Sequence, residues 1–126
     1  MKHDITSFED IKFLVDHFYA MVQRDSMIGP IFNARLKGRW ELHNQKLYRF
    51  WNTVILHKPD YNGNPVPLHF TLNIDKDNFQ RWLSIWDEII DTHFEGVVAQ
   101  RAKHRGRMMA NAFLAKINNA LNAKSI

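Results

Sequence analysis

Two histidines occupy positions from which they can face a common ligand. His43 is the one polar residue in the apolar stripe of a strongly amphipathic stretch, residues 40–56. His69 follows residues 57–68, which are rich in proline and in turn-forming residues. A histidine on a buried helix face and a second one after a rigid loop suit opposite sides of a flat ligand, and this suggests a haem pocket. The alternative for His43 is an ordinary core histidine with one hydrogen bond.

Two aromatic residues with polar atoms lie on helix faces that the sequence predicts to be buried. Tyr19 belongs to the apolar face of the first amphipathic stretch, which is predicted as Ile11, Leu14, Val15, Phe18, Tyr19 and Val22. Trp82 belongs to the apolar face of residues 79–93, which is predicted as Phe79, Trp82, Leu83, Trp86, Ile89, Ile90 and His93. A buried phenol or indole needs a hydrogen-bond partner. Each residue is therefore either a core ring whose polar atom reaches a carbonyl oxygen or the surface, or a donor to a ligand.

Haem requires an axial nitrogen, an apolar slot and a distal side with suitable donors. His69 can supply the axial ligand to iron, while Tyr19, His43 and Trp82 can supply the distal polar groups. Lys46 lies at the edge of the His43 stripe, where its stem can cover apolar surface and its ammonium group can meet an anion. The side chains predicted to form the slot are Phe32, Leu47, Phe50 and the inner face of the Trp82 helix.

Other kinds of chemistry find little support in the sequence. The chain has no cysteine, which excludes disulfides, thiolate metal sites and cysteine nucleophiles. Its seven histidines form no pair with the spacing of a zinc site, and its five glycines form no phosphate-binding loop. No motif of a serine nucleophile is present either.

The periodic stretches predict helices and no strands. A capping box of Thr6 and Glu9 is expected to start the first helix, and Pro30 favours a fresh start before a short helix at 31–36. Asp75 and Asp77 are candidate caps of a later helix. The last helix is expected over 97–121. The stripe of the third helix is predicted as Trp40, His43, Leu47, Phe50, Trp51 and Val54, and the inner face of the last as Val98, Ala102, Met109, Ala112, Phe113, Ile117 and Leu121.

Length and composition fit one soluble domain, residues 1–126. Of the 126 residues, 45% are hydrophobic and 24% are charged, as in ordinary globular proteins. The polar start and the lack of a long apolar run predict no signal peptide and no membrane span. The absence of cysteine is typical of a reducing compartment, so we expect a cytoplasmic protein. The net charge of +4 permits weak attraction to nucleic acid, but the basic run 101–107 is expected to be a solvated helix face.

Several motifs, in this order and spacing, resemble the third group of truncated haemoglobins. The resemblance covers nearly the whole sequence, and the paired glycines of the first two groups are missing, as in the third group. The motifs are Phe18-Tyr19, Gly29-Pro30-Ile31-Phe32-Asn33, Trp40-x-x-His43, Phe50-Trp51, Asp60-Tyr61-Asn62-Gly63-x-Pro65, His69 and Phe79-x-x-Trp82-Leu83.

The resemblance implies an all-α globin fold, shortened to a 2-on-2 sandwich of helix pairs around one haem b. It implies that His69 is the proximal iron ligand and His43 the distal histidine, with Tyr19 and Trp82 as distal donors. Phe32 would pack on the porphyrin, and Tyr61 is counted among the haem-binding residues. Leu68 offers no charge to a haem propionate, so Lys46 or water takes that role.

The function expected from this resemblance is binding of dioxygen and other diatomic ligands. Oxidation of nitric oxide or reduction of peroxide is a further expectation, and either would need an external reductase. Two alternatives stay open. One is a haem sensor or electron carrier in which His43 also binds the iron. The other is a cofactor-free helical interaction module that uses residues 101–107.

Overall fold

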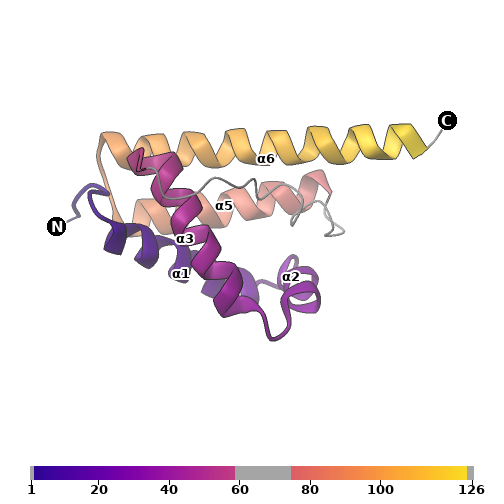
Figure 1. Ribbon diagram of the computed structural model, residues 1–126, viewed down its shortest axis with the longest axis horizontal. Helices are drawn as coiled ribbons and strands as arrows, with labels where there is room; N and C mark the ends of the chain where they lie inside the picture. The colour runs from indigo at the N-terminus through magenta and orange to yellow at the C-terminus, as the bar shows by residue number, and fades with distance from the viewer. Residues whose placement is uncertain (1, 59–74, 125–126) are drawn as a thin grey trace.

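The computed structural model describes residues 2–58 and 75–124, with side chains through residue 115 (Figure 1). This part of the chain forms α1 (Phe8–Arg24), α2 (Gly29–Leu36), α3 (Trp40–Leu56), α5 (Lys76–His93) and α6 (Val97–Lys124). Within these residues the only β feature is an isolated bridge between His3 and Phe94. The prediction of an all-α protein is confirmed.

The helices pack in a few defined pairs. α5 and α6 run side by side, and α1 lies against α5 (Figure 1). α3 crosses this group and contacts both α1 and α6, while the short α2 contacts α1. α1, α3 and α5 therefore surround a common interior, to which each contributes its apolar face.

The first helix begins one residue later than the capping box predicted. Ser7 is the N-cap, and its hydroxyl accepts a hydrogen bond from the Asp10 N–H. The Asp10 carboxylate accepts in return from the Thr6 N–H at 2.9 Å. The expected pair of Thr6 and Glu9 is thus wrong by one position. Serine and threonine both cap helices, and Asp10 stands three residues after Ser7 just as Glu9 stands three residues after Thr6.

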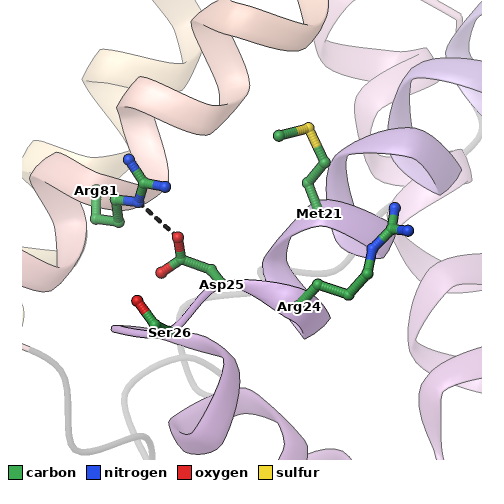
Figure 2. Close-up of a pocket in the computed structure, with 5 residues that line it drawn as sticks. All are labelled: Met21, Arg24, Asp25, Ser26 and Arg81. Atoms are coloured by element: carbon green, nitrogen blue, oxygen red, sulfur yellow. Dashed lines mark hydrogen bonds and ion pairs between the residues drawn. The ribbon is translucent and has the colours of Figure 1, made fainter.

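Asp25 organises the corner between α1 and α2. Its carboxylate accepts hydrogen bonds from the N–H groups of Met27 and Ile28, each at 3.0 Å, and forms an ion pair with Arg81 of α5 at 2.6 Å. α2 then starts at Gly29, where a Cβ would lie 2.8 Å from the Gln23 carbonyl oxygen. The ion pair lies beside a hollow of about 550 Å³. Its lining residues are Met21, Arg24, Asp25, Ser26 and Arg81 (Figure 2).

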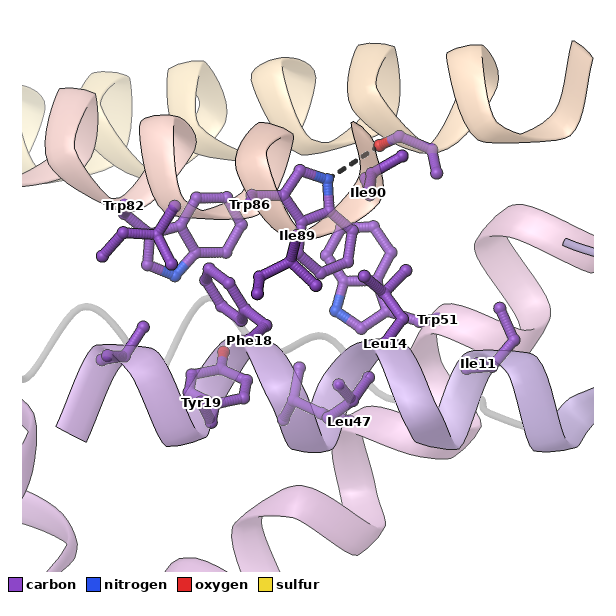
Figure 3. Packing of buried hydrophobic residues seen from close by; sticks show 14 of the residues in the cluster. Ile11, Leu14, Phe18, Tyr19, Leu47, Trp51, Trp82, Trp86, Ile89 and Ile90 are labelled. Atoms are coloured by element: carbon purple, nitrogen blue, oxygen red, sulfur yellow. Dashed lines mark hydrogen bonds between the residues drawn. The ribbon is translucent and has the colours of Figure 1, made fainter. Parts of the chain in front are cut away.

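The core is dominated by aromatic rings from three helices (Figure 3). All six predicted apolar positions of α1 are buried: Ile11, Leu14, Val15, Phe18, Tyr19 and Val22. Across from them, α5 buries Phe79, Trp82, Ile85, Trp86, Ile89 and Ile90. Ile85 replaces the predicted Leu83 on this face, since Leu83 is only half-buried.

The buried face of α3 is rotated slightly from the predicted stripe. His43, Leu47 and Trp51 are buried as expected, but Asn52 and Ile55 join them. The predicted stripe members Trp40, Phe50 and Val54 are half-buried. The difference arises because α3 lies between α1 and α6, and both neighbours cover part of its surface.

Alanines make up most of the buried inner face of α6. Ala99, Ala102, Ala110 and Phe113 are buried. Val98 and Met109 of the predicted face are half-buried, and Ala112 is exposed. The helix extends to Lys124 instead of ending at 121, and the side chains of Ile117 and Leu121 lie outside the described part. Small side chains let two helix backbones approach closely, so α5 and α6 pack tightly at this face.

The basic run of α6 is partly neutralised by α5. Lys103 pairs with Asp91 and Arg107 pairs with Asp87, each at 2.9 Å. Ala102 and Gly106 of this run are buried and Lys103 is half-buried, so only part of the run is the solvated helix face that the sequence predicts. In the described ranges, no helix has both the length and the apolar character that a bilayer span requires.

Candidate functional site

Tyr19 lies at the centre of an aromatic cluster formed by α1, α2 and α3. Its side chain is 0% exposed. Its ring centroid is 4.8 Å from that of His43, 5.8 Å from that of Trp40 and 6.3 Å from that of Phe32. The sequence placed Tyr19 and His43 on buried faces of separate helices, and the tertiary structure brings those faces together. Trp40, which was given no role in the predicted site, is a third wall of this cluster.

The polar atoms of Tyr19 and Trp82 are buried close to each other. The side chains point to the same region between α1 and α5 (Figure 3). Neither the Tyr19 hydroxyl nor the Trp82 Nε1 has a hydrogen-bond partner in residues 2–58 and 75–115. Burial raises the pKa of the Tyr19 hydroxyl, and the nearby Trp82 N–H opposes this rise without completing a well-formed hydrogen bond. The phenol therefore stays protonated at neutral pH and keeps its O–H as a donor.

Two unpartnered buried donors are costly unless a ligand accepts their hydrogen bonds. The two donors come from different helices, and the ring that carries each donor packs on Phe18. The Phe18 centroid lies 4.6 Å from Tyr19 and 5.0 Å from Trp82. The arrangement fits a small ligand with a polar or partly negative atom. It also fits the distal side of a haem, for which the two residues were predicted as donors.

His43 is buried beside this pair and is 4% exposed. Desolvation lowers the pKa of its imidazole, and the positive charge of Lys46 lowers it further, while a contact with Asn44 acts in the opposite direction. His43 is therefore neutral at physiological pH. A neutral imidazole can donate to a bound ligand or offer a lone pair, depending on its tautomer.

The remaining predicted pocket residues of the described chain lie on α2 and α3. Phe32 and Leu47 are buried, at 1% and 2% exposure, and Phe50 is half-buried. Lys46 is exposed on α3, three residues beyond His43. Its position allows its ammonium group to reach an anion at the edge of a pocket. Each of these roles stays a prediction.

Two predicted residues lie outside the described residues. His69, the expected iron ligand, and Tyr61 both fall within 59–74. The site as the structure gives it is therefore the predicted distal half.

The structure adds residues that the sequence did not single out. Trp51 is fully buried, and its Nε1 has no hydrogen-bond partner within the described ranges. Trp86 stacks between Trp51 and Trp82. Both were recognised as apolar-face residues, but periodicity does not say which buried indole faces a site.

Comparison with known proteins identifies the family. The chain is 30% identical over 117 residues to the group 3 truncated hemoglobin ctb of Campylobacter jejuni, covering 90% of this chain and 92% of that protein. The chain belongs to the group 3 truncated haemoglobins. A crystal structure of the group III truncated hemoglobin from Campylobacter jejuni matches it with a TM-score of 0.82 and 29% identity, over 93% of this chain and 95% of that one.

Membership of the group 3 truncated haemoglobins agrees with the fold. The predicted family and the predicted globin-like, all-α class are both confirmed. No protein-family model matches the chain. Tyr19, His43 and Trp82 lie on α1, α3 and α5, which pack around one interior.

Proposed function

We propose that this truncated haemoglobin binds haem b and uses its distal residues to hold dioxygen and other diatomic ligands. The observation that carries the proposal is the pair of buried, unpartnered donors of Tyr19 and Trp82. Haem iron, held by His69 as the sequence predicts, would supply the atom to which a diatomic ligand attaches.

Tyr19 and Trp82 would donate hydrogen bonds to the ligand. A phenol O–H and an indole N–H are both donors, and a ligand that gains negative charge on binding is stabilised by them. Because the donors are already desolvated and held by packing, little conformational entropy is lost when the ligand binds. Strong retention is the expected result, and it argues against a role in simple oxygen delivery.

The other pocket residues have supporting roles in this proposal. Phe32, Leu47 and Phe50 would provide the apolar slot and exclude water. Tyr61, which was also predicted to bind haem, would contact the haem as well. Lys46 would pair with a haem propionate. His43 would close the distal side or contribute a third polar group.

Redox activity is a finer part of the same proposal. Oxidation of nitric oxide by dioxygen to nitrate consumes one electron, and reduction of hydrogen peroxide to two waters consumes two electrons and two protons. Either reaction would need an external reductase, and we infer that such a partner exists if the protein turns over. The cytoplasmic location also remains a prediction.

The test is an absorption spectrum of the purified protein, ferric and then reduced, before and after carbon monoxide. We expect a Soret band that shifts with carbon monoxide and that collapses in His69→Ala. A colourless wild type that cannot take up haem would overturn the proposal. It would favour the cofactor-free interaction module instead.

One observation favours a second candidate function, that of a haem sensor or electron carrier. Burial holds His43 neutral beside Tyr19, and neutral imidazole is the form that binds iron. A bis-histidyl spectrum of the ferrous protein without added ligand would favour a sensor or electron carrier. A five-coordinate ferrous spectrum would exclude that reading in favour of open ligand binding.

A further inference from the structure

We infer that Trp86 is a positioning residue that holds the indole of Trp82 at the angle from which its N–H faces the ligand pocket, and that α6 fixes Trp86 for this purpose. This inference rests on the proposed function, since it concerns how a distal donor is aimed. Phe18 lies between Trp86 and Tyr19, with ring centroids 5.1 Å and 4.6 Å away from them, so Trp86 acts on the site through its neighbours (Figure 3).

Trp86 is anchored to the backbone of α6. Its side chain is 0% exposed, and its Nε1 donates a hydrogen bond of 3.0 Å to the carbonyl oxygen of Ala102. Ala102 is itself buried within α6, so the backbone acceptor is held in place by the helix. An indole has a single N–H, and a hydrogen bond from it fixes the direction of the ring edge.

Gly106 provides the space that this indole needs. A Cβ at Gly106 would lie 2.6 Å from both the Cδ1 and the Nε1 of Trp86. Real atoms do not approach so closely, so any larger residue at 106 would displace the indole edge. Ala102 and Gly106 lie one turn apart on α6, and together they define the place of Trp86.

Trp86 passes this constraint to Trp82 through ring stacking. The two indoles are nearly parallel, at 12° with centroids 5.8 Å apart. Trp51 stacks on Trp86 from the other side at 4.5 Å. Phe18 meets the edges of both Trp82 and Trp86, at 82° and 87°. A tilt of Trp86 would therefore remove the flat surface on which Trp82 rests.

The orientation of the Trp82 ring matters because no partner among the described residues holds its N–H in place. Its own Nε1 is buried and unpartnered, so packing alone fixes its direction. Hydrogen-bond strength falls steeply when the donor angle departs from linearity. A rotation of the Trp82 ring would weaken donation to a ligand without changing the donor itself.

The experiment compares carbon monoxide complexes of the ferrous holoproteins of wild type, Trp82→Phe, Trp86→Phe and the double variant. Two quantities are measured: the carbon monoxide dissociation rate and the C–O stretching frequency, which reports the polarity around the ligand. We expect Trp86→Phe to shift the C–O stretch in the same direction as Trp82→Phe and to raise the dissociation rate by about three- to tenfold. In the Trp82→Phe background, Trp86→Phe should add less than about twofold, because it acts through Trp82.

Gly106→Ala is the second variant, and it leaves every tryptophan in place. It should move the C–O stretch of the wild type but not that of Trp82→Phe. Phe94→Leu is the matched control, since Phe94 is a buried ring that packs against Phe13 and His3 and not against the indole stack. It should lower thermal stability and leave the C–O stretch unchanged.

Two outcomes would overturn the positioning role. One is an unchanged C–O stretch in both Trp86→Phe and Gly106→Ala. The other is an equal effect of Trp86→Phe in the presence and absence of Trp82, which would mark a general loss of structure. Haem uptake by the wild type, read from the Soret band, tests the proposed function separately and before these comparisons are made.

Discussion

At the scale of single residues, the candidate site depends on buried polar atoms that lack a well-formed hydrogen bond among the described residues. Tyr19 and Trp82 each bury a donor without a described acceptor. The Trp86 N–H, which lies in the same core, has its acceptor in Ala102. The contrast separates Trp86, whose N–H is satisfied within the protein, from Trp82 and Trp51, whose N–H groups have no acceptor in the described ranges.

Tyr19→Phe should raise the dissociation rate of dioxygen by about tenfold, because one hydrogen bond to a polarised ligand is lost while the ring is kept. Stopped-flow or flash-photolysis kinetics on the holoprotein would measure it. Tyr48→Phe is the matched control, since the Tyr48 hydroxyl donates to Asp16 and lies outside the Tyr19 cluster. Equal dissociation rates in wild type and Tyr19→Phe would remove the donor role of Tyr19.

Asp25 should make the stability of the protein depend on acid. Desolvation raises the pKa of its carboxyl group, but the Ile28 N–H, the Arg81 side chain and the Met27 N–H outweigh it, and the net pKa is lowered. Folding therefore favours the ionised form. The stabilisation is complete above the ordinary pKa of about 3.8 and is lost as the pH falls through the lower, folded-state pKa.

Asp25→Asn should reduce the free energy of unfolding by about 1–3 kcal/mol at neutral pH, because hydrogen bonds to a charged acceptor are replaced by neutral ones. The difference from wild type should shrink as the pH is lowered below 4. Urea unfolding at a series of pH values would measure it. A difference that stays constant down to pH 2 would show that the ionisation of Asp25 does not contribute.

At the scale of elements, the ends and corners of helices set where the pocket helices point. α1 carries Tyr19 and is fixed at its start by Ser7 and at its end by Asp25. The Asp25–Arg81 ion pair ties that corner to α5, one residue before Trp82. The two helices that carry the donors are thus linked at the same end of the pocket.

The start of α1 gives a test of the observed capping box. Asp10→Ala should lower the free energy of unfolding by about 0.5–2 kcal/mol, because the Thr6 N–H loses its acceptor and the first turn loses a favourable charge. Glu9→Ala, which removes an acidic residue of the same turn, should change it by less than half a kcal/mol. Thermal or chemical denaturation would measure the free energy of unfolding of both variants. A larger effect of Glu9→Ala would show that the capping box is formed by Thr6 and Glu9, as the sequence predicts.

At the scale of the whole molecule, the interior is built largely from aromatic rings of α1, α3 and α5, covered by the small-residue face of α6. A cofactor that fills this interior would bind the folded chain and not the unfolded one. Its binding free energy would then add to the stability of the fold.

Haem should therefore raise the thermal midpoint of the protein, and the rise should depend on haem concentration. At 100-fold excess over the dissociation constant the gain is about 2.7 kcal/mol. Differential scanning calorimetry of haem-free and haem-loaded protein would measure it, with His69→Ala as the matched variant that should gain less. An equal gain in both proteins would show that His69 does not hold the group.

The sequence by itself determined the class of fold, most buried faces and the identity of the three distal candidates. It did so because helical periodicity records burial directly, as in α1, where all six predicted apolar positions are buried. The motifs around Tyr19, His43 and Trp82 also sufficed to indicate the family, which the relatives confirm.

Only the tertiary structure decided which polar atoms stay without partners and how the indoles are aimed. Periodicity marks Trp51, Trp82 and Trp86 alike as buried, since it carries no information on what lies opposite each ring. Their difference depends on a carbonyl of Ala102 and on the absence of a side chain at Gly106, residues on a helix far along the chain. Contacts between distant segments follow from how the helices pack, and a local pattern cannot encode them.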